Sequence, residues 1–260
     1  MTGTARTTFD LAHEAIGDGP PIVLLHPIAM RGAFWRRVAT LLAPHFRTIL
    51  VDLRGHGANP RPQEPFSLDD LAADVIQLVR DRGWSPAVFV GCSLGGMVAQ
   101  GVAVHAPELV SGLVIANSTH RMPPAGVDVM TNRAAQALNA FAAAVESDLA
   151  RWFSPAFAKA HPETVEQARQ WALANAPQVV ANGWRAIAGL DYEARLGKVT
   201  QPVLALTGSL DPASPPAQAQ AMAQAFPNGR ALVLAAAGHF TPLEQPTAFA
   251  DAVRSLADRH

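Results

Sequence analysis

Hydrophobic positions follow two alternating patterns along the first half of the chain. Short, continuous apolar runs are typical of strands buried on both faces of a sheet. Between them, apolar residues recur at helical spacing, as in an amphipathic helix. The runs predict strands at 22–25, 47–53, 87–90 and 113–117, with helices at 33–42, 67–78 and after residue 93. This alternation favours parallel strands joined by right-handed crossovers, with helices on both faces.

The alternation stops at His120 and returns only after Gly197. The intervening sequence is rich in alanine and predicts helices at 127–144, 148–158, 162–175 and 177–190, with no strand. Strands at 203–206 and 231–234 and helices at 216–226 and 247–257 follow. We therefore expect an α/β core formed by residues 1–119 and 198–260, with an inserted all-helical lid at 120–197.

The apolar run that begins at Ala87 ends in Gly91-Cys92-Ser93-Leu94-Gly95, and a helical pattern follows. A serine on a sharp turn between strand and helix needs small neighbours two positions away on each side, and both are glycine here. The start of the next helix directs free N–H groups and a positive dipole end toward the same point. We predict that Ser93 is a nucleophile.

Partners for this serine are expected after other strands, because parallel-sheet enzymes carry their chemistry beyond the carboxyl ends of the strands. Asp211 follows the strand at 203–206, and His239 follows the strand at 231–234. An imidazole can take the serine proton, and a carboxylate can fix the imidazole tautomer. The segment 117–119 after another strand contains no carboxylate. Ser93, His239 and Asp211 are therefore the predicted catalytic residues.

Two backbone N–H groups are needed to bind the oxyanion of a tetrahedral intermediate. Leu94, directly after the serine, is expected to supply one. The other is expected from the loop after the strand at 22–25, where Pro27 has no N–H group and Ile28 is the better candidate.

Candidate pocket residues carry less specific signals. Trp152, His120 and Met30 are predicted to contact substrate, although an aromatic residue at helical spacing is also expected to pack a lid onto its core. Arg121 and Arg151 offer a test of substrate type, because a substrate with a free carboxylate favours a guanidinium in the pocket. Exposure to solvent is the alternative expected for both arginines.

Composition narrows the classes of function. The 20 basic and 21 acidic residues among 260 leave no net field for nucleic acid or an anionic membrane. A single cysteine excludes an internal disulfide, the first twenty residues lack a secretory pattern, and no apolar run is long enough to cross a bilayer. No His or Cys spacing predicts a metal site. We expect a cytoplasmic protein that acts on a small molecule, as a monomer or a homodimer.

Several motifs together resemble the α/β-hydrolase superfamily across nearly the whole chain. Leu25-His26-Pro27 is similar to the family's His-Gly oxyanion loop, with proline in place of the usual glycine. The segments 52–57, Asp-Leu-Arg-Gly-His-Gly, and 238–246, around His239, resemble two further family motifs. The order Ser, Asp, His along the chain also agrees. The stretch 95–110 is similar to 3-oxoadipate enol-lactonases and related carboxylesterases, which implies ester or lactone hydrolysis without a cofactor.

The sequence thus predicts an α/β-hydrolase fold and a serine hydrolase that cleaves a small carboxylic ester or lactone through an acyl-enzyme. A thioesterase, an acyl-homoserine lactonase or a carbon–carbon hydrolase could use the same three residues. A different class also stays open, namely a ligand-sensing protein with this fold and vestigial turnover.

Overall fold

The computed structural model describes residues 9–258, so the outermost residues of the predicted core, 1–8 and 259–260, lie outside the described part. Within it, a seven-stranded sheet has the order β1-β3-β2-β4-β5-β6-β7. Its strands are β1 (His13–Ile16), β2 (Pro21–Leu25), β3 (Arg47–Val51), β4 (Ala87–Cys92), β5 (Val110–Ala116), β6 (Val203–Gly208) and β7 (Gly229–Leu234). Only β1 is antiparallel to its neighbour; the other pairs are parallel. The predicted mostly parallel sheet is confirmed.

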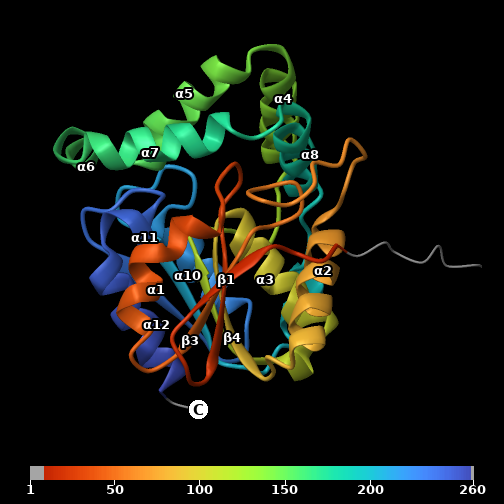
Figure 1. The fold of residues 1–260 in the computed structure, drawn as a ribbon, viewed down its shortest axis with the longest axis vertical. Coiled ribbons are helices and arrows are strands. Elements are labelled where there is room, and N and C mark those ends of the chain that lie inside the picture. The colour runs from red at the N-terminus through yellow and green to blue at the C-terminus, as the bar shows by residue number, and fades with distance from the viewer. Residues whose placement is uncertain (1–8, 259–260) are drawn as a thin grey trace, which may run out of the picture.

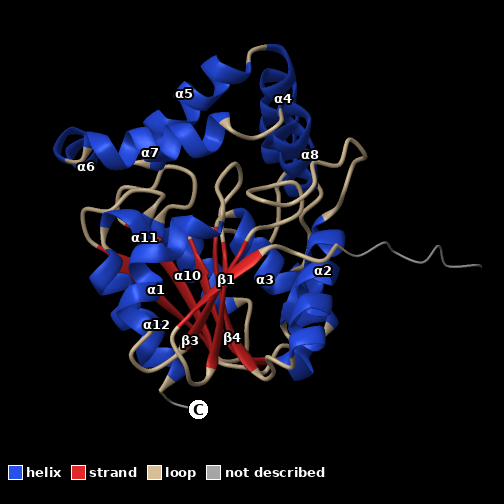
Figure 2. Ribbon diagram, viewed as in Figure 1, coloured by secondary structure: helices blue, strands red, loops and turns tan. Residues whose placement is uncertain are grey.

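Helices cover both faces of this sheet (Figure 1, Figure 2). One face carries α1 (Arg36–Leu42) and α12 (Pro246–Ala257), which pack on each other, and the other carries α2 (Leu68–Arg82) and α3 (Leu94–His105). Smaller elements are η1 (Gly32–Trp35), η2 (Pro107–Leu109), α10 (Pro216–Gln224) and α11 (Thr241–Glu244). Strands β2 and β4 are almost completely buried between these layers, as their continuous apolar sequences predict.

Local sequence signals explain where several helices begin. Ser67 and Asp70 form a capping box at the start of α2, where each side chain accepts a hydrogen bond from the other residue's backbone N–H. Gly83 ends the same helix in the left-handed conformation, at φ 64°. Proline begins several other helices, where its missing N–H group leaves no hydrogen bond unmade.

Between β5 and β6 the chain forms a run of helices; all but the short last one, which packs against α3, lie beyond one end of the sheet (Figure 1). They are α4 (Pro124–Asn139), α5 (Phe141–Trp152), α6 (Pro155–Ala160), α7 (Pro162–Leu173), α8 (Pro177–Ala188) and α9 (Glu193–Leu196). The predicted helix at 127–144 is wrong in its extent, because the chain breaks at Ala140 (φ −151°, ψ 56°) and a new helix starts. The helix predicted at 148–158 likewise divides between α5 and α6.

No helix among residues 9–258 combines the length and the apolar character that a membrane span requires.

Candidate active site

Ser93 lies on a sharp turn between the end of β4 and the start of α3, with φ 52° and ψ −115°. This backbone conformation is strained for any residue but glycine. A Cβ on Gly91 would overlap the carbonyl oxygen of Gly95, and a Cβ on Gly95 would overlap the carbonyl oxygen of Leu25. The two glycines therefore allow the turn to close, and the Ser93 side chain remains partly accessible to solvent.

His239 and Asp211 are joined by a hydrogen bond. His239 Nδ1 lies 2.8 Å from Asp211 Oδ2 in a buried setting. Because an ionised carboxylate can only accept, the proton is on Nδ1, and Nε2 is left free to accept a proton. The two residues lie in the loops after β7 and β6, at the carboxyl ends of adjacent strands.

Asp211 is held in its ionised form by several donors. Its oxygens accept hydrogen bonds from the backbone N–H groups of Ala213 (2.8 Å) and Ser214 (3.1 Å) and from Asn117 Nδ2 (2.9 Å). Burial by itself would raise the pKa of Asp211, but the charge of His239 and these hydrogen bonds lower it to about 2. Asp211 is therefore a carboxylate at any pH near neutrality.

The loop that contains Ile28 is held by two buried histidines. His56 Nε2 accepts from the Ala29 N–H (3.3 Å), and His26 Nε2 accepts from the Leu53 N–H (2.9 Å). Burial lowers the pKa of His56 to about 4 and that of His26 well below its usual value. Both imidazoles are thus neutral, which the two N–H donors require. Ala29 itself has φ 60°, so this loop is strained.

Ser93 and His239 both line a cavity of about 100 Å³. Its other walls come from the core and from α4, α5 and α8: Met97, Asn117, Thr119, Met122, Met130, Arg133, Arg151, Trp152, Trp184, Ile187, Ala213 and Ser214. Trp152 stacks on Phe240 at a ring distance of 4.9 Å, next to His239. The cavity is mainly apolar, and its polar groups are the hydroxyl, amide and guanidinium side chains of these lining residues.

The remaining predicted pocket residues lie elsewhere. Met30 is buried and lines a separate small hollow with Trp171 and Asn175. His120 is half-buried, with Nε2 3.9 Å from a carboxylate oxygen of Glu193. Arg121 is exposed and also pairs with Glu193, at 2.7 Å. Of the two arginines considered from the sequence, only Arg151 faces the cavity of Ser93.

Arg151 belongs to a cluster with Arg133 and Asp148 that the sequence did not reveal. Arg133 Nη1 lies 2.8 Å from Asp148 Oδ1, and Arg151 Nη2 bonds to the same oxygen. Burial raises the pKa of Asp148 to about 6, although the charge of Arg133 acts in the opposite direction. Asp148 therefore neutralises at most one of the two positive charges.

Asn117 is a further functional candidate that sequence reasoning missed. Its amide donates to Asp211, and its Oδ1 accepts from the Thr241 hydroxyl at 2.5 Å. The signal was its position at the end of β5, beside the strand that carries Asp211. Because Asn117 carries an amide, it did not fit the acid role expected after this strand. Arg133 offered no comparable signal, because nothing in the sequence fixes how α4 is rotated toward the cavity.

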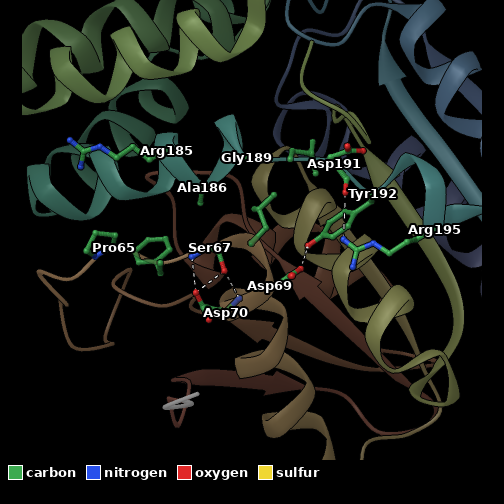
Figure 3. Close-up of a pocket in the computed structure, with 13 residues that line it drawn as sticks. Pro65, Ser67, Asp69, Asp70, Arg185, Ala186, Gly189, Asp191, Tyr192 and Arg195 are labelled. Atoms are coloured by element: carbon green, nitrogen blue, oxygen red, sulfur yellow. Dashed lines mark hydrogen bonds between the residues drawn. The ribbon is translucent and has the colours of Figure 1, made fainter. Parts of the chain in front are cut away.

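A larger hollow of about 430 Å³ lies apart from these residues, between the start of α2 and the segment 185–195 (Figure 3). Its lining includes Asp69, whose Oδ1 accepts from the Tyr192 hydroxyl at 2.9 Å. Asp70, Asp191, Arg185 and Arg195 line it as well, so its charges are mixed. It contains none of the predicted catalytic residues. Among residues 9–258, no cluster of His, Cys, Asp and Glu has the composition of a metal site.

Comparison with known proteins identifies the family of this chain. Residues 20–246 match the family described as alpha/beta hydrolase fold. The chain therefore belongs to this family, as its motifs predicted, and the family resemblance to enol-lactonases is confirmed by its relatives.

Two curated relatives cover nearly the whole chain. 3-Oxoadipate enol-lactonase 2 of Acinetobacter baylyi is 29% identical over 93% of this chain and 90% of its own length. Pimeloyl-[acyl-carrier protein] methyl ester esterase of Photobacterium profundum is 32% identical over 96% and 98%, respectively. Both names describe hydrolysis at a carboxylic ester or lactone.

Two solved structures are similar throughout. A malate-bound thermophilic esterase from Thermogutta terrifontis gives a TM-score of 0.90 at 28% identity, covering 96% of this chain and 93% of its own. The enol-lactonase from Burkholderia xenovorans gives 0.90 at 26% identity, covering 95% and 96%. The chain thus shares its fold and family with esterases and lactonases.

Proposed function

We propose that this protein is a serine hydrolase that cleaves a small carboxylic ester or lactone. The observation that carries the proposal is the meeting of Ser93 and His239 in one cavity, with His239 Nδ1 bonded to Asp211. In this arrangement His239 Nε2 can accept the Ser93 proton, and Asp211 stabilises the imidazolium that forms.

In the proposed reaction, Ser93 Oγ attacks the carbonyl carbon while its proton passes to His239. The N–H groups of Leu94 and Ile28 bind the oxyanion of the tetrahedral intermediate. Its collapse breaks the ester bond, and His239 gives its proton to the leaving alkoxide. A water molecule then attacks the acyl-enzyme with His239 as base, and the carboxylic acid leaves as Ser93 regains its proton.

Residues 120–197 act, in this proposal, as a lid that selects the substrate. Support comes from the cavity of Ser93, where Met130 of α4, Trp152 of α5, and Trp184 and Ile187 of α8 form much of the wall. A small, mainly apolar cavity favours a short acyl or alcohol chain over a bulky one.

The relatives support esters and lactones over the other reactions open to these residues. The two curated relatives reported above are named for an enol-lactone and a methyl ester, and neither name describes a free thioester or a carbon–carbon bond as the bond cleaved. Water is the acyl acceptor in a hydrolase, and no cofactor is required by this chemistry.

A substrate panel tests the proposal. The purified protein is assayed with methyl and p-nitrophenyl esters of short acids, with γ- and δ-lactones, and with the matching thioesters, alongside Ser93→Ala. We expect turnover of esters or lactones that Ser93→Ala loses by at least about 10³-fold. A higher kcat/KM for thioesters than for oxygen esters, or equal rates in both proteins, would contradict it.

A further inference from the structure

We propose that Arg133 and Arg151 form a carboxylate-binding subsite in the cavity of Ser93, so that the preferred substrate carries a free carboxylate as well as its ester or lactone. The inference rests on the proposed function and specifies its substrate class. It points to half-esters of dicarboxylic acids, or to lactones that bear a carboxylate.

Both guanidinium groups lie at the cavity that contains Ser93. Arg133 comes from α4 and Arg151 from the last turn of α5, and both line the same cavity as Ser93 and His239. A carboxylate bound there would belong to the same molecule as the carbonyl that Ser93 attacks. The arginines are partly shielded from water, with side-chain exposures of 17% for Arg133 and 39% for Arg151.

The cluster contains more positive than negative charges. Two guanidiniums share one carboxylate, that of Asp148, through a single oxygen. No Asp or Glu side chain is among the described residues that line the cavity, and within this part of the chain Asp148 is the carboxylate that pairs with both arginines. One guanidinium charge is therefore left without an ion-pair partner of its own at the cavity wall. An anionic substrate group would neutralise it where screening by water is reduced.

The guanidinium groups also have hydrogen-bond donors that no described residue uses. A guanidinium has five N–H donors in a planar fork that suits a carboxylate. The Nε of Arg151 is buried and has no hydrogen-bond partner among residues 9–258. Arg133 lies over the Trp184 ring, with 4.9 Å from Cζ to the ring centroid, so its guanidinium is held against the cavity wall by this contact and by Asp148. The pair of arginines thus has a fixed position and at least one buried donor to spare.

The same cavity also has an apolar lining. Met97, Met130, Trp184 and Ile187 line the cavity together with Ser93 and the arginines. They provide a surface for methylene groups that separate an ester from a carboxylate. A neutral ester would contact the same wall but would leave the excess positive charge unpaired.

The experiment compares monomethyl adipate with the methyl ester of adipic acid monoamide, which has the same length but no charge. We expect the wild-type kcat/KM to be at least about tenfold higher for the half-ester, a typical gain from one charge-assisted pair. In Arg133→Met this ratio should fall at least about tenfold. Arg151→Met, a more exposed position and therefore safer for folding, should lower the ratio in the same direction.

Arg121→Met is the matched control, because Arg121 is exposed, pairs with Glu193 and does not line the cavity. It should change neither kcat/KM value. Equal wild-type values for the two esters, or an equal loss for both esters in Arg133→Met and Arg151→Met, would overturn the proposal. The second result would mean that the cluster only joins α4 to α5.

A binding measurement separates failure of this proposal from failure of the proposed function. Calorimetric titration of Ser93→Ala with monomethyl adipate and with the uncharged methyl ester of adipic acid monoamide needs no turnover. Binding of monomethyl adipate that is lost in the double variant Ser93→Ala, Arg133→Met supports the subsite even if no ester is hydrolysed. Ester turnover by the wild type without any preference in binding for the half-ester over the uncharged ester would reject the subsite and leave the hydrolase proposal intact.

Discussion

Asp211 shows how neighbouring residues set the state of one side chain. Its carboxylate is buried, yet it accepts hydrogen bonds from two backbone N–H groups, from Asn117 and from His239. These donors offset the cost of burying a charge. The resulting fixed carboxylate keeps the His239 proton on Nδ1, so that Nε2 is free to accept the proton of Ser93.

Asp211→Asn should therefore remove activity without removing the fold. The backbone N–H groups of Ala213 and Ser214 hold the side-chain carbonyl oxygen, so the amide NH2 faces His239 Nδ1 and favours the other tautomer, in which Nε2 carries the proton and cannot act as a base. We expect kcat to fall about 10³- to 10⁴-fold, with little change in KM. Steady-state kinetics with a short ester measures this, and a loss below about tenfold would contradict the assigned role.

The same carboxylate should contribute to the pH dependence of stability. Its pKa is about 2 in the folded protein, below the value of the unfolded chain. The stabilisation is therefore complete above about pH 4, is lost as the pH falls toward 2, and amounts to about 2 kcal/mol. Denaturant unfolding from pH 6 to pH 3 should show the free-energy gap between wild type and Asp211→Asn narrowing only below about pH 4. A constant gap would argue against a low pKa.

Functional residues that directly follow a strand could be predicted from the sequence. Ser93, Asp211 and His239 each follow a predicted strand, and their roles stay predictions that the geometry supports. The role of Arg133 could not be predicted, because the sequence of a helix does not show whether a polar residue faces a cavity or the solvent. Asn175 was missed for a related reason, since its partner lies 146 residues away in sequence.

At the scale of elements, the segment between α7 and α8 is tied to the loop that contains Ile28. Asn175 Nδ2 donates to the Ala29 carbonyl oxygen at 2.8 Å and to carbonyl oxygens at the end of α7. The Ile28 side chain packs close to Gly183 of α8. The strained loop is thus held by the core histidines on one side and by the helical insertion on the other.

Asn175→Ala should consequently weaken oxyanion binding, because the Ile28 N–H loses a support of its loop. We expect kcat to fall about tenfold, less than the loss from deleting an oxyanion donor outright. The inhibition constant of a trifluoromethyl ketone, which mimics the tetrahedral intermediate, should rise in parallel.

Asn182→Ala is the matched control, since Asn182 is a buried asparagine of α8 that donates instead to the carbonyl oxygens of Gln63 and Glu64. It should lower stability to a similar degree and leave the inhibition constant nearly unchanged. The same effect of both variants on the inhibitor would show that Asn175 has only a structural role.

Element boundaries were predictable where a residue enforces them. Pro162 and Pro177 begin α7 and α8 at the predicted positions. The break at Ala140 was not predictable, because alanine has the highest helix propensity; α4 packs against α5 and α8, contacts between segments that the local sequence does not encode.

At the scale of the whole molecule, the formal net charge is −1 at pH 7, so the protein has no long-range field that attracts anions. Recognition of a carboxylate would then depend on the local Arg133–Asp148–Arg151 cluster. We expect kcat/KM for monomethyl adipate to change less than about twofold between 20 and 200 mM NaCl. A steep decrease with salt would indicate steering by surface charges instead.

The architecture was predictable because the alternation of buried strands and amphipathic helices permits few topologies. The mostly parallel sheet followed from this alternation, whereas the α/β-hydrolase fold was implied by the resemblance of the motifs, and both are confirmed. The arrangement of α4, α5 and α8 around the cavity of Ser93 did not follow, since helices rich in alanine carry weak apolar faces.

The most direct test of the central claim is the pre-steady-state reaction of the protein with a short p-nitrophenyl ester, followed by mass spectrometry of the quenched enzyme. We predict a burst of p-nitrophenol equal to the enzyme concentration and an acyl group on the peptide that contains Ser93. Both should be absent from Ser93→Ala. Turnover without an acyl group on Ser93, or an equal burst from Ser93→Ala, would contradict the account.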